Sequence, residues 1–310
     1  MMVPPIPRRK TRVLSVGGVK IGGDNPIVVQ SMCVSPTHDA AAVIKEILGL
    51  EEAGCEIVRV SVPDKESAAA LPEILRNVNI PVIADIHFDF RMALLAAEAG
   101  VQGLRINPGN IGKREKVQEV VRACKSRGIP MRIGVNGGSL EKHLLEKYGC
   151  PTPEAMVESA LEHIKILEDE DFTDIKVSLK SSNVRMTVAA YRLLADKVDY
   201  PFHLGITEAG TAWSGAIKSS IGLGILLHDG LGDTVRVSLS ADPREEVKVA
   251  FEILKDLGIR ERGITLVSCP SCARAQVDQI ALAQAVEQRL GHIKAPMTVA
   301  VMGCAVNGPG

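Results

Sequence analysis

The sequence predicts an α/β protein, a (β/α)8 TIM barrel followed by a second, smaller α/β domain. From Pro26 onward, eight short runs rich in β-branched residues alternate with amphipathic segments, which is typical of the strand–helix units of a parallel barrel. Polar residues stand at the ends of most of these runs. The alternation stops near Leu257, and the chain of 310 residues has room for more than one barrel of about 250 residues.

The expected strands are short and mostly apolar, as strands buried on both faces are. They are Ile27–Met32, Ile57–Val62, Val82–Ile86, Gly103–Ile106, Met131–Val135, Asp174–Leu179, Phe202–Ile206 and Thr234–Leu239. Amphipathic helices are expected at Ala40–Ala53, Arg91–Ala99, Lys113–Arg127, Glu154–Glu168, Val184–Val198 and Glu245–Leu257. Start signals stand at Thr152-Pro153 and Asp242-Pro243. Glycines suited to C-terminal caps are Gly54, Gly100, Gly128 and Gly258.

A hairpin is expected in front of the barrel, over Val13–Gly23, where two short runs flank Gly17-Gly18. Such a hairpin would plug the bottom of the barrel. The main alternative to the barrel is a doubly wound open sheet, because eight strands alone do not prove that the sheet closes.

The domain boundary is expected between residues 259 and 260, with the barrel over 1–259 and the second domain over 260–310. The second domain has a strand at Ile264–Val267, a helix at Asp278–Leu290 and a strand at Met297–Met302. The polar segment Arg260–Gly263 is expected to link the two domains.

The composition excludes several classes of protein. Lys and Arg number 36 against 37 Asp and Glu, so the chain lacks the basic excess of nucleic-acid and anionic-membrane binders. Aromatic residues make up 3%, which also argues against binding of single-stranded nucleic acid. No run reaches the roughly 18 apolar residues of a membrane helix, and the N-terminus lacks a signal-peptide core. We therefore expect a cytoplasmic protein whose seven cysteines are thiols or metal ligands.

Arginines and lysines recur at the carboxyl ends of the expected strands, where the active sites of such barrels lie. The set is Arg59, Arg105, Arg132, Lys176, Lys180 and Arg236. Like charges repel in a poorly solvated site, so this set indicates a ligand with several anionic oxygens, and diphosphate fits best. The alternative role for any one of them is structural, as a partner of Asp85 or Glu208 inside a packed barrel.

Uncharged or acidic residues complete the expected strand ends. They are Ser61, Asp85, His87, Asn107, Asn136, Ser178, His203 and Ser238. His87 and His203 could equally be core histidines. Glu208 follows the seventh strand and is a candidate proton donor, with a salt-bridge partner as its alternative role.

Three cysteines lie in the second domain. Cys269 and Cys272 form a C-x-x-C pair, and 31 residues separate Cys272 from Cys304. A thiol pair at this spacing can hold iron or zinc or form a redox disulfide, and reduced core thiols are the alternative. The other four, Cys33, Cys55, Cys124 and Cys150, are expected to be small buried residues.

Several of these stretches together resemble one known family. The motifs are Val29-Gln30-Ser31-Met32, Val58-Arg59-Val60-Ser61, Ala84-Asp85-Ile86-His87-Phe88, Leu104-Arg105-Ile106-Asn107-Pro108-Gly109-Asn110, Arg132-Ile133-Gly134-Val135-Asn136, His203-Leu204-Gly205-Ile206-Thr207-Glu208-Ala209-Gly210, Ser268-Cys269-Pro270-Ser271-Cys272 and Gly303-Cys304-Ala305-Val306-Asn307-Gly308-Pro309-Gly310. In order and combination they resemble the 4-hydroxy-3-methylbut-2-enyl diphosphate synthases of the non-mevalonate isoprenoid pathway, the GcpE family.

The resemblance implies an iron–sulfur oxidoreductase. Its reaction would be the reductive ring opening and dehydration of 2-C-methyl-D-erythritol 2,4-cyclodiphosphate, with flavodoxin or ferredoxin as electron donor. It implies a head-to-tail homodimer and a C-terminal domain that carries a [4Fe-4S] cluster. By motif match, the diphosphate ligands are Arg59, Arg105, Arg132 and Lys176, and Ser238 joins the substrate-binding set. Asp85, His87, Asn107 and Asn136 would orient the substrate, Glu208 would handle protons, and Cys269, Cys272 and Cys304 would bind the cluster.

In the family the fourth cluster ligand is a Glu directly after Asn-Gly-Pro-Gly, and this sequence stops at Gly310. The sequence therefore predicts a C-terminally truncated member with an incomplete iron–sulfur domain and doubtful turnover of its own. Two rival hypotheses remain from the residues. One is a cluster-free phosphate-binding lyase or aldolase that uses Lys176 or Lys180 as a Schiff-base nucleophile. The other is a ligand-binding domain without catalysis.

Overall fold

The computed structural model describes residues 6–111, 114–270, 272–304 and 306. The chain divides into two compact units, Met1–Leu257 and Gly258–Gly310. The first unit is built around eight parallel strands. They are β3 (Val28–Met32), β4 (Ile57–Ser61), β5 (Val82–Asp85), β6 (Gly103–Ile106), β7 (Met131–Asn136), β8 (Ile175–Lys180), β9 (His203–Leu204) and β10 (Thr234–Val235).

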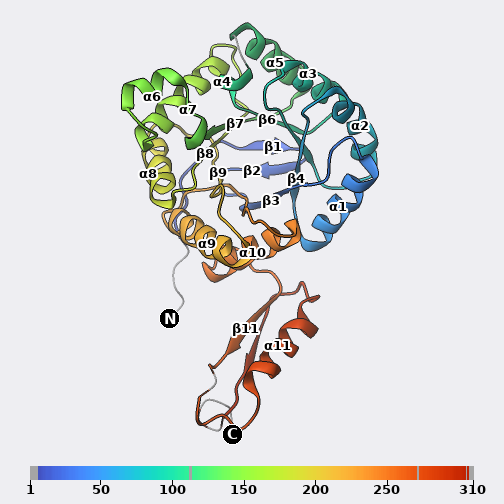
Figure 1. The fold of residues 1–310 in the computed structure, drawn as a ribbon, viewed down its shortest axis with the longest axis vertical. Helices are drawn as coiled ribbons and strands as arrows, with labels where there is room; N and C mark the ends of the chain where they lie inside the picture. Colours follow the sequence, from blue (N-terminus) through green and yellow to red (C-terminus); the bar gives the residue numbers. More distant parts are fainter. Residues whose placement is uncertain (1–5, 112–113, 271, 305, 307–310) are drawn as a thin grey trace. The chain divides into compact units, whose positions relative to one another are not determined.

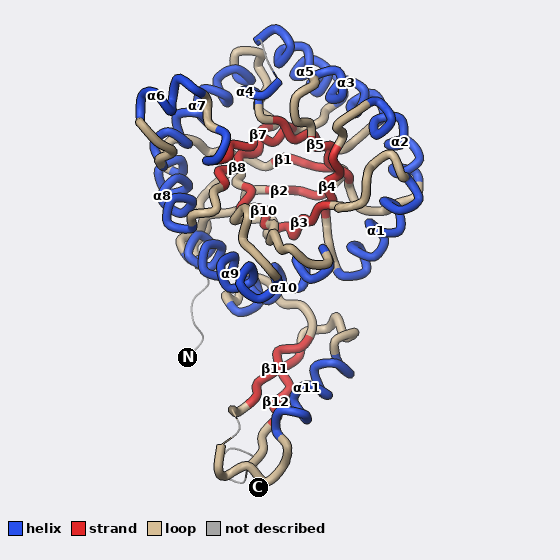
Figure 2. The backbone as a smooth tube through the Cα atoms, in the orientation of Figure 1, coloured by secondary structure: helices blue, strands red, loops and turns tan. Residues whose placement is uncertain are grey.

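The sheet runs in the order β8-β7-β6-β5-β4-β3-β10-β9. A parallel bridge between Val177 of β8 and Phe202, next to β9, joins the two ends of this order. The strands therefore form a ring, and the open-sheet alternative is wrong. Figure 2 shows the ring of strands enclosed by helices.

The helices cover the outer face of the ring, as Figure 1 shows. They are α1 (Ala40–Ala53), α2 (Lys65–Arg76), α3 (Phe90–Ala99), α4 (Pro108–Ile111), α5 (Arg114–Arg127), α6 (Lys142–Tyr148), α7 (Pro153–Glu168), α8 (Val184–Ala195), α9 (Ala212–His228) and α10 (Pro243–Asp256), with a 3-10 turn η1 at Gly137–Ser139. The predicted start signals are confirmed: the Thr152 side chain accepts from Ala155 N, and the Asp242 side chain accepts from Arg244 N.

A hairpin of β1 (Leu14–Val16) and β2 (Val19–Ile21) crosses one end of the ring (Figure 2). Leu14, Val16 and Ile21 form one buried cluster with Val28, Ile57 and Ile83, which lie in the first halves of their strands. The predicted plug is confirmed, because this cluster closes the amino end of the barrel with apolar contacts. The carboxyl end is thereby left as the end at which a ligand can enter.

The last two barrel strands are shorter than the sequence predicts. Regular pairing ends at Leu204 in β9 and at Val235 in β10. The chain continues beside the barrel as irregular backbone, and Arg236 N still donates to Leu204 O over 3.0 Å. Polar side chains take over the hydrogen bonds that a longer ladder would make, as described below for Leu239.

The second unit is a strand–helix–strand unit. Strands β11 (Ile264–Ser268) and β12 (Met297–Val301) are parallel and paired along their whole length, and α11 (Gln279–Leu290) connects them. The expected order of elements after residue 260 matches this arrangement. The parallel pairing places the ends of both strands at the same edge, where the cysteine-bearing segments begin.

Candidate active site

Three predicted cations lie side by side on neighbouring strands. Arg105 of β6 pairs in register with Arg132 of β7, and Arg132 pairs with Lys176 of β8. Residues at one level of a parallel sheet point to the same face, so all three share the inner face of the barrel. Gly134, two residues after Arg132, faces the Arg105 guanidinium: a Cβ atom there would lie 2.7 Å from Arg105 Nε. Glycine at this position leaves the space that the Arg105 side chain fills.

Asp85 is the acid at the centre of this group. Its carboxylate lies 3.0 Å from Arg105 Nη1, 3.3 Å from Arg59 Nε and 4.0 Å from His87 Nε2. Burial alone would raise the pKa of Asp85, but the charges of Arg59 and Arg105 outweigh it and lower the pKa to about 2. The carboxylate is therefore ionised, and the structural role expected for Asp85 as a partner of these arginines is confirmed.

Several nitrogen atoms of the cations lack a protein partner. Lys176 is 2% exposed, and its Nζ atom makes no hydrogen bond within the described part of the chain. The same holds for the Nε atoms of Arg105 and Arg132. Burial, followed by the charge of Arg132, lowers the pKa of Lys176 to about 7. Unsatisfied buried donors are costly, so these atoms are candidates for hydrogen bonds to an acceptor from outside the chain.

Lys180 and His203 form a second contact on the inner face. Lys180 Nζ lies 3.3 Å from His203 Nε2, and His203 Nδ1 lies 2.7 Å from Thr234 Oγ1. Burial and the neighbouring charge of Lys180 hold the pKa of His203 well below its usual value. His203 is therefore a neutral, fully engaged core histidine, which was the second of its two expected roles.

Arg236 is held by an acid that the sequence did not point to. Its Nη2 atom lies 3.4 Å from Oε1 of Glu246, which reaches in from α10. Glu246 is 3% exposed although it occupies a helix whose pattern looks amphipathic. The only feature of the sequence that could have indicated a buried role for Glu246 is its position three residues after the start of α10, in a run of charged residues.

The remaining predicted binding residues lie at the same end of the barrel. Asn107 is buried directly after β6, and Ser238 is half-buried in the segment after β10. The Asn136 side chain accepts from Gly138 N over 3.1 Å and so caps the turn after β7. His87 is partly exposed after β5, in contact with Asp85. These residues lie at or just after the carboxyl ends of their strands. The prediction that every cation stands at a carboxyl end is wrong for Arg132 and Lys176, which are the second residues of β7 and β8.

Glu208 follows the seventh strand, on the loop between β9 and α9, four residues after β9 ends. Its side chain is exposed, and its carboxylate forms no ion pair within the described residues. Its backbone has φ of 52°, in the left-handed region that non-glycine residues rarely adopt. Strain of this kind is concentrated at functional sites, which agrees with a functional role for the loop.

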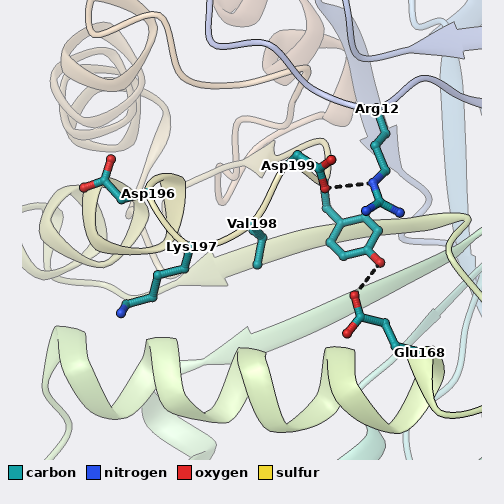
Figure 3. Close-up of a pocket in the computed structure, with 7 residues that line it drawn as sticks. Arg12, Glu168, Asp196, Lys197, Val198 and Asp199 are labelled. Carbon is teal, nitrogen blue, oxygen red and sulfur yellow. Dashed lines mark hydrogen bonds and ion pairs between the residues drawn. The ribbon is translucent and has the colours of Figure 1, made fainter.

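A surface hollow of about 390 Å³ is lined by none of these cations. Figure 3 shows its lining residues. Its lining comes from segments that precede β1, β8 and β9, at the amino end of the barrel. Arg12 Nε donates to Asp199 Oδ1 over 2.7 Å, and the Tyr200 hydroxyl donates to Glu168 Oε1 over 2.8 Å. Because its arginine is already paired and its other lining charges are mostly acidic, this hollow is a poor match for an anionic ligand.

The segments that carry the three cysteines of the second unit begin at one edge of its strand pair. Cys269 follows β11 and Cys304 follows β12, and Ser268 pairs in register with Val301. Cys269 N donates to Val301 O, and Gln276 N donates to Gly303 O over 2.8 Å, which ties the Cys272 loop to the segment before Cys304. Among the described residues, however, no three His, Cys, Asp or Glu side chains are grouped closely enough to hold a metal ion.

The other cysteines divide into two kinds. Cys33, Cys55 and Cys124 are buried, as predicted, and burial raises the pKa of Cys55 and of Cys124 to about 12. The prediction for Cys150 is wrong, because this thiol is exposed. Cys150 lies in the turn between α6 and α7. In the described part of the chain, no helix has the length and apolar character needed to cross a membrane.

Solved structures of other proteins share this fold. A sialic acid synthetase from Leptospira borgpetersenii has a TM-score of 0.58 and 13% identity, with 89% of this chain and 97% of that chain covered. A dihydropteroate synthase from Stenotrophomonas maltophilia has a TM-score of 0.57 and 14% identity, with 79% and 97% covered. At such low identity the likeness supports the barrel fold alone.

Closer relatives are found by sequence. The flavodoxin-type 4-hydroxy-3-methylbut-2-en-1-yl diphosphate synthase of Symbiobacterium thermophilum is 60% identical over 305 residues, which cover 98% of this chain and 82% of the relative. The enzyme of the same name from Maridesulfovibrio salexigens is 62% identical, with 98% and 85% covered. These identities favour the synthase reading over the lyase or aldolase alternative.

Family models match both units. The GcpE TIM-barrel domain matches residues 11–251, and the GcpE protein C-terminal domain matches residues 265–310. The two matches follow one another in the order expected from the sequence motifs. The chain therefore belongs to the GcpE family, the 4-hydroxy-3-methylbut-2-en-1-yl diphosphate synthases, which are iron–sulfur oxidoreductases of non-mevalonate isoprenoid biosynthesis.

Proposed function

We propose that the carboxyl end of the barrel binds 2-C-methyl-D-erythritol 2,4-cyclodiphosphate through its diphosphate group. The observation that carries this proposal is the excess of positive charge inside the barrel. Three of the six Arg and Lys side chains are buried and three are half-buried, and among the described residues the acids that form ion pairs with them are Asp85 and Glu246. A diphosphate supplies both the missing negative charge and the acceptors for Lys176 Nζ and the arginine Nε atoms.

The residues divide by the part of the substrate that they serve. Arg59, Arg105, Arg132 and Lys176 bind diphosphate oxygens, and Ser238 adds a hydroxyl donor. Asp85, His87, Asn107 and Asn136 orient the substrate. The net reaction takes up two electrons and two protons, opens the ring at a carbon–oxygen bond and releases one water. Glu208, exposed on its loop, gives a proton to the departing hydroxyl group.

The iron–sulfur group belongs to the second unit. Thiolates are the ligands that iron–sulfur clusters use, and the segments that carry Cys269, Cys272 and Cys304 begin at one edge of the β11–β12 pair and are joined by backbone hydrogen bonds. We assign these three cysteines to a [4Fe-4S] cluster, with one further ligand from outside this set. When bound, the cluster supplies the electrons, which reduced flavodoxin or ferredoxin provides.

The proposal is tested in two stages. First, the untreated chain is titrated with the cyclodiphosphate by calorimetry, and binding that weakens steeply with salt is expected, since the contacts are charged. Second, the chain is reconstituted anaerobically with iron and sulfide. A broad visible absorption is expected in the wild type and in Cys150→Ala, whose thiol is exposed on the barrel, and not in Cys269→Ala or Cys304→Ala. A colourless protein, or equal colour in all four, contradicts the cluster assignment.

An exposed apolar stripe supports the proposed homodimer. Trp213, Ile217, Ile221 and Ile225 recur every four residues on α9, with exposures of 79%, 45%, 52% and 38%. The stripe is symmetric about position 219, so in an antiparallel pair of α9 helices Ile217 meets Ile221 of the second copy and Trp213 meets Ile225. These side chains give roughly half of the about 800 Å² per partner of a standard interface.

Ile221→Lys should convert the dimer to a monomer, because it places a charge at the centre of the apolar stripe. Light scattering coupled to size exclusion measures the mass. Trp213 is the single tryptophan of the chain, so its emission should shift to the red in the monomer. Leu48→Lys is the control, since Leu48 is similarly exposed, at 43%, on α1. A wild-type monomer, or a dimer unaffected by Ile221→Lys, contradicts this assignment.

A further inference from the structure

The geometry points to Glu246 as a positioning residue that fixes Arg236 and the Ser238 segment for diphosphate binding. The inference rests on the proposed function and adds to it a residue that touches no substrate. Glu246 belongs to none of the motifs by which the family is recognised in this sequence.

The Glu246 carboxylate reaches three different segments. Oε1 accepts from Leu239 N over 3.0 Å, and Oε2 accepts from Ser31 Oγ of β3 over 3.1 Å. Arg236 Nη2 lies 3.4 Å from Oε1 and 3.5 Å from Oε2. One side chain from the outer layer thus links β3, the segment after β10 and an inner-face cation.

The hydrogen bond from Leu239 N to Glu246 is made where the backbone pairing between β10 and β3 has already ended. β10 pairs with β3 only at Thr234–Val28 and Val235–Val29. Beyond Val235 no further rung joins the two segments, and the Leu239 amide is satisfied by Glu246. The carboxylate therefore sets the position of the backbone between residues 236 and 239, which includes Ser238.

Glu246 also holds Arg236 against repulsion. Arg236 contributes to lowering the pKa of Arg59 and of Lys180, so these cations are close enough to repel one another. Glu246 is in contact with only one terminal nitrogen of Arg236, and Arg236 Nε has no partner in the described residues. The guanidinium is therefore anchored while some of its donors stay available for a ligand.

The test begins with Glu246→Gln, which keeps the shape and the acceptor for Leu239 N and removes the charge. Calorimetry with the cyclodiphosphate should show affinity reduced about tenfold, because the anchored Arg236 is released to its repelling neighbours. Glu245→Gln is the matched control, since Glu245 is the adjacent residue and pairs with Lys248 on the outside of α10. Its affinity should stay within about twofold of the wild type.

A double-variant cycle separates positioning from general damage. If Glu246 acts through Arg236, adding Glu246→Gln to Arg236→Gln should weaken binding by less than about twofold. The inference is overturned if the double variant loses affinity by the product of the two single losses. It is also overturned if a folded Glu246→Gln protein binds the cyclodiphosphate with unchanged affinity.

Nitrogen NMR of arginine-labelled protein supplies a readout that needs no substrate. The Arg236 Nε–H signal, identified by its loss in Arg236→Gln, should move or broaden in Glu246→Gln and not in Glu245→Gln. An unmoved signal overturns the inference. A wild-type chain that does not bind the cyclodiphosphate refutes the proposed function instead, and the NMR result still decides the role of Glu246.

Discussion

Asp85→Asn should lower the free energy of unfolding of the ligand-free protein by about 3–5 kcal/mol at pH 7, the usual cost of removing one partner from a buried ionic group. Asp85 is 3% exposed and in contact with both Arg59 and Arg105. Asparagine matches its shape but leaves two buried guanidinium groups without a negative charge. Urea unfolding followed by circular dichroism measures the change.

Asp89→Asn is the control for this experiment. Asp89 lies four residues further on, pairs with Arg91 on the surface and caps α3, and asparagine is an equally good cap. Its stability should change by less than about 1 kcal/mol, as for other exposed pairs. If both substitutions lowered the free energy of unfolding equally, the buried ion pairs of Asp85 would stabilise the protein no more than an exposed pair does.

The effect of Asp85→Asn should also depend on pH. The pKa of Asp85 is lowered from its ordinary 3.8 to about 2 in the folded protein. A carboxyl group with a depressed folded pKa contributes stability above its unfolded pKa and loses it as the pH falls. The part of the difference that arises from ionisation should therefore shrink between about pH 4 and pH 2, and a difference that grows on acidification would contradict the assignment.

The sequence predicted the barrel well because its signals are periodic and repeated. Buried parallel strands are continuous apolar runs, and the structure confirms all eight, with ends that shift by a few residues at β9 and β10. Those two strands are short because side-chain contacts, such as Glu246 to Leu239 N, replace the ladder. A contact between residues on different elements leaves no local pattern, so the shortening could not be predicted.

The inner-face cations were predictable for the same reason. Arg59, Arg105, Arg132 and Lys176 interrupt apolar runs in which a charge is costly, and the alternation along a strand assigns them to one face. Glu246 was missed because a glutamate in the first turn of a helix is ordinary on the surface. Cys150 was misplaced because a lone cysteine carries no periodicity that would indicate its exposure.

Lys176→Met should stabilise the ligand-free protein by about 2 kcal/mol or more at pH 7 and at the same time weaken diphosphate binding. Burial, followed by the charge of Arg132, lowers the pKa of Lys176 from 10.5 to about 7. One pKa unit corresponds to about 1.4 kcal/mol, so holding the ammonium form in the folded protein costs several kcal/mol. Methionine has a similar length and no charge, and it removes this cost.

The pH dependence gives the sign of the effect. Between about pH 7 and pH 10.5 the unfolded chain binds a proton that the folded chain has released, so the wild type gains stability as the pH rises. Below about pH 7 the cost is present in full. The advantage of Lys176→Met should therefore be largest near pH 7 and below, and should diminish towards pH 10. Lys197→Met, at an exposed lysine, is the control and should show neither trend.

The same variant separates a binding role from a structural one. Inorganic pyrophosphate should raise the melting temperature of the wild type, because it binds only the folded state, and should raise that of Lys176→Met much less. A lysine that served the fold would behave in the opposite way, with its replacement lowering stability and leaving the pyrophosphate shift intact. Lys176 Nζ makes no hydrogen bond within the described residues. A pyrophosphate shift that is unchanged in Lys176→Met would therefore contradict the proposed binding role.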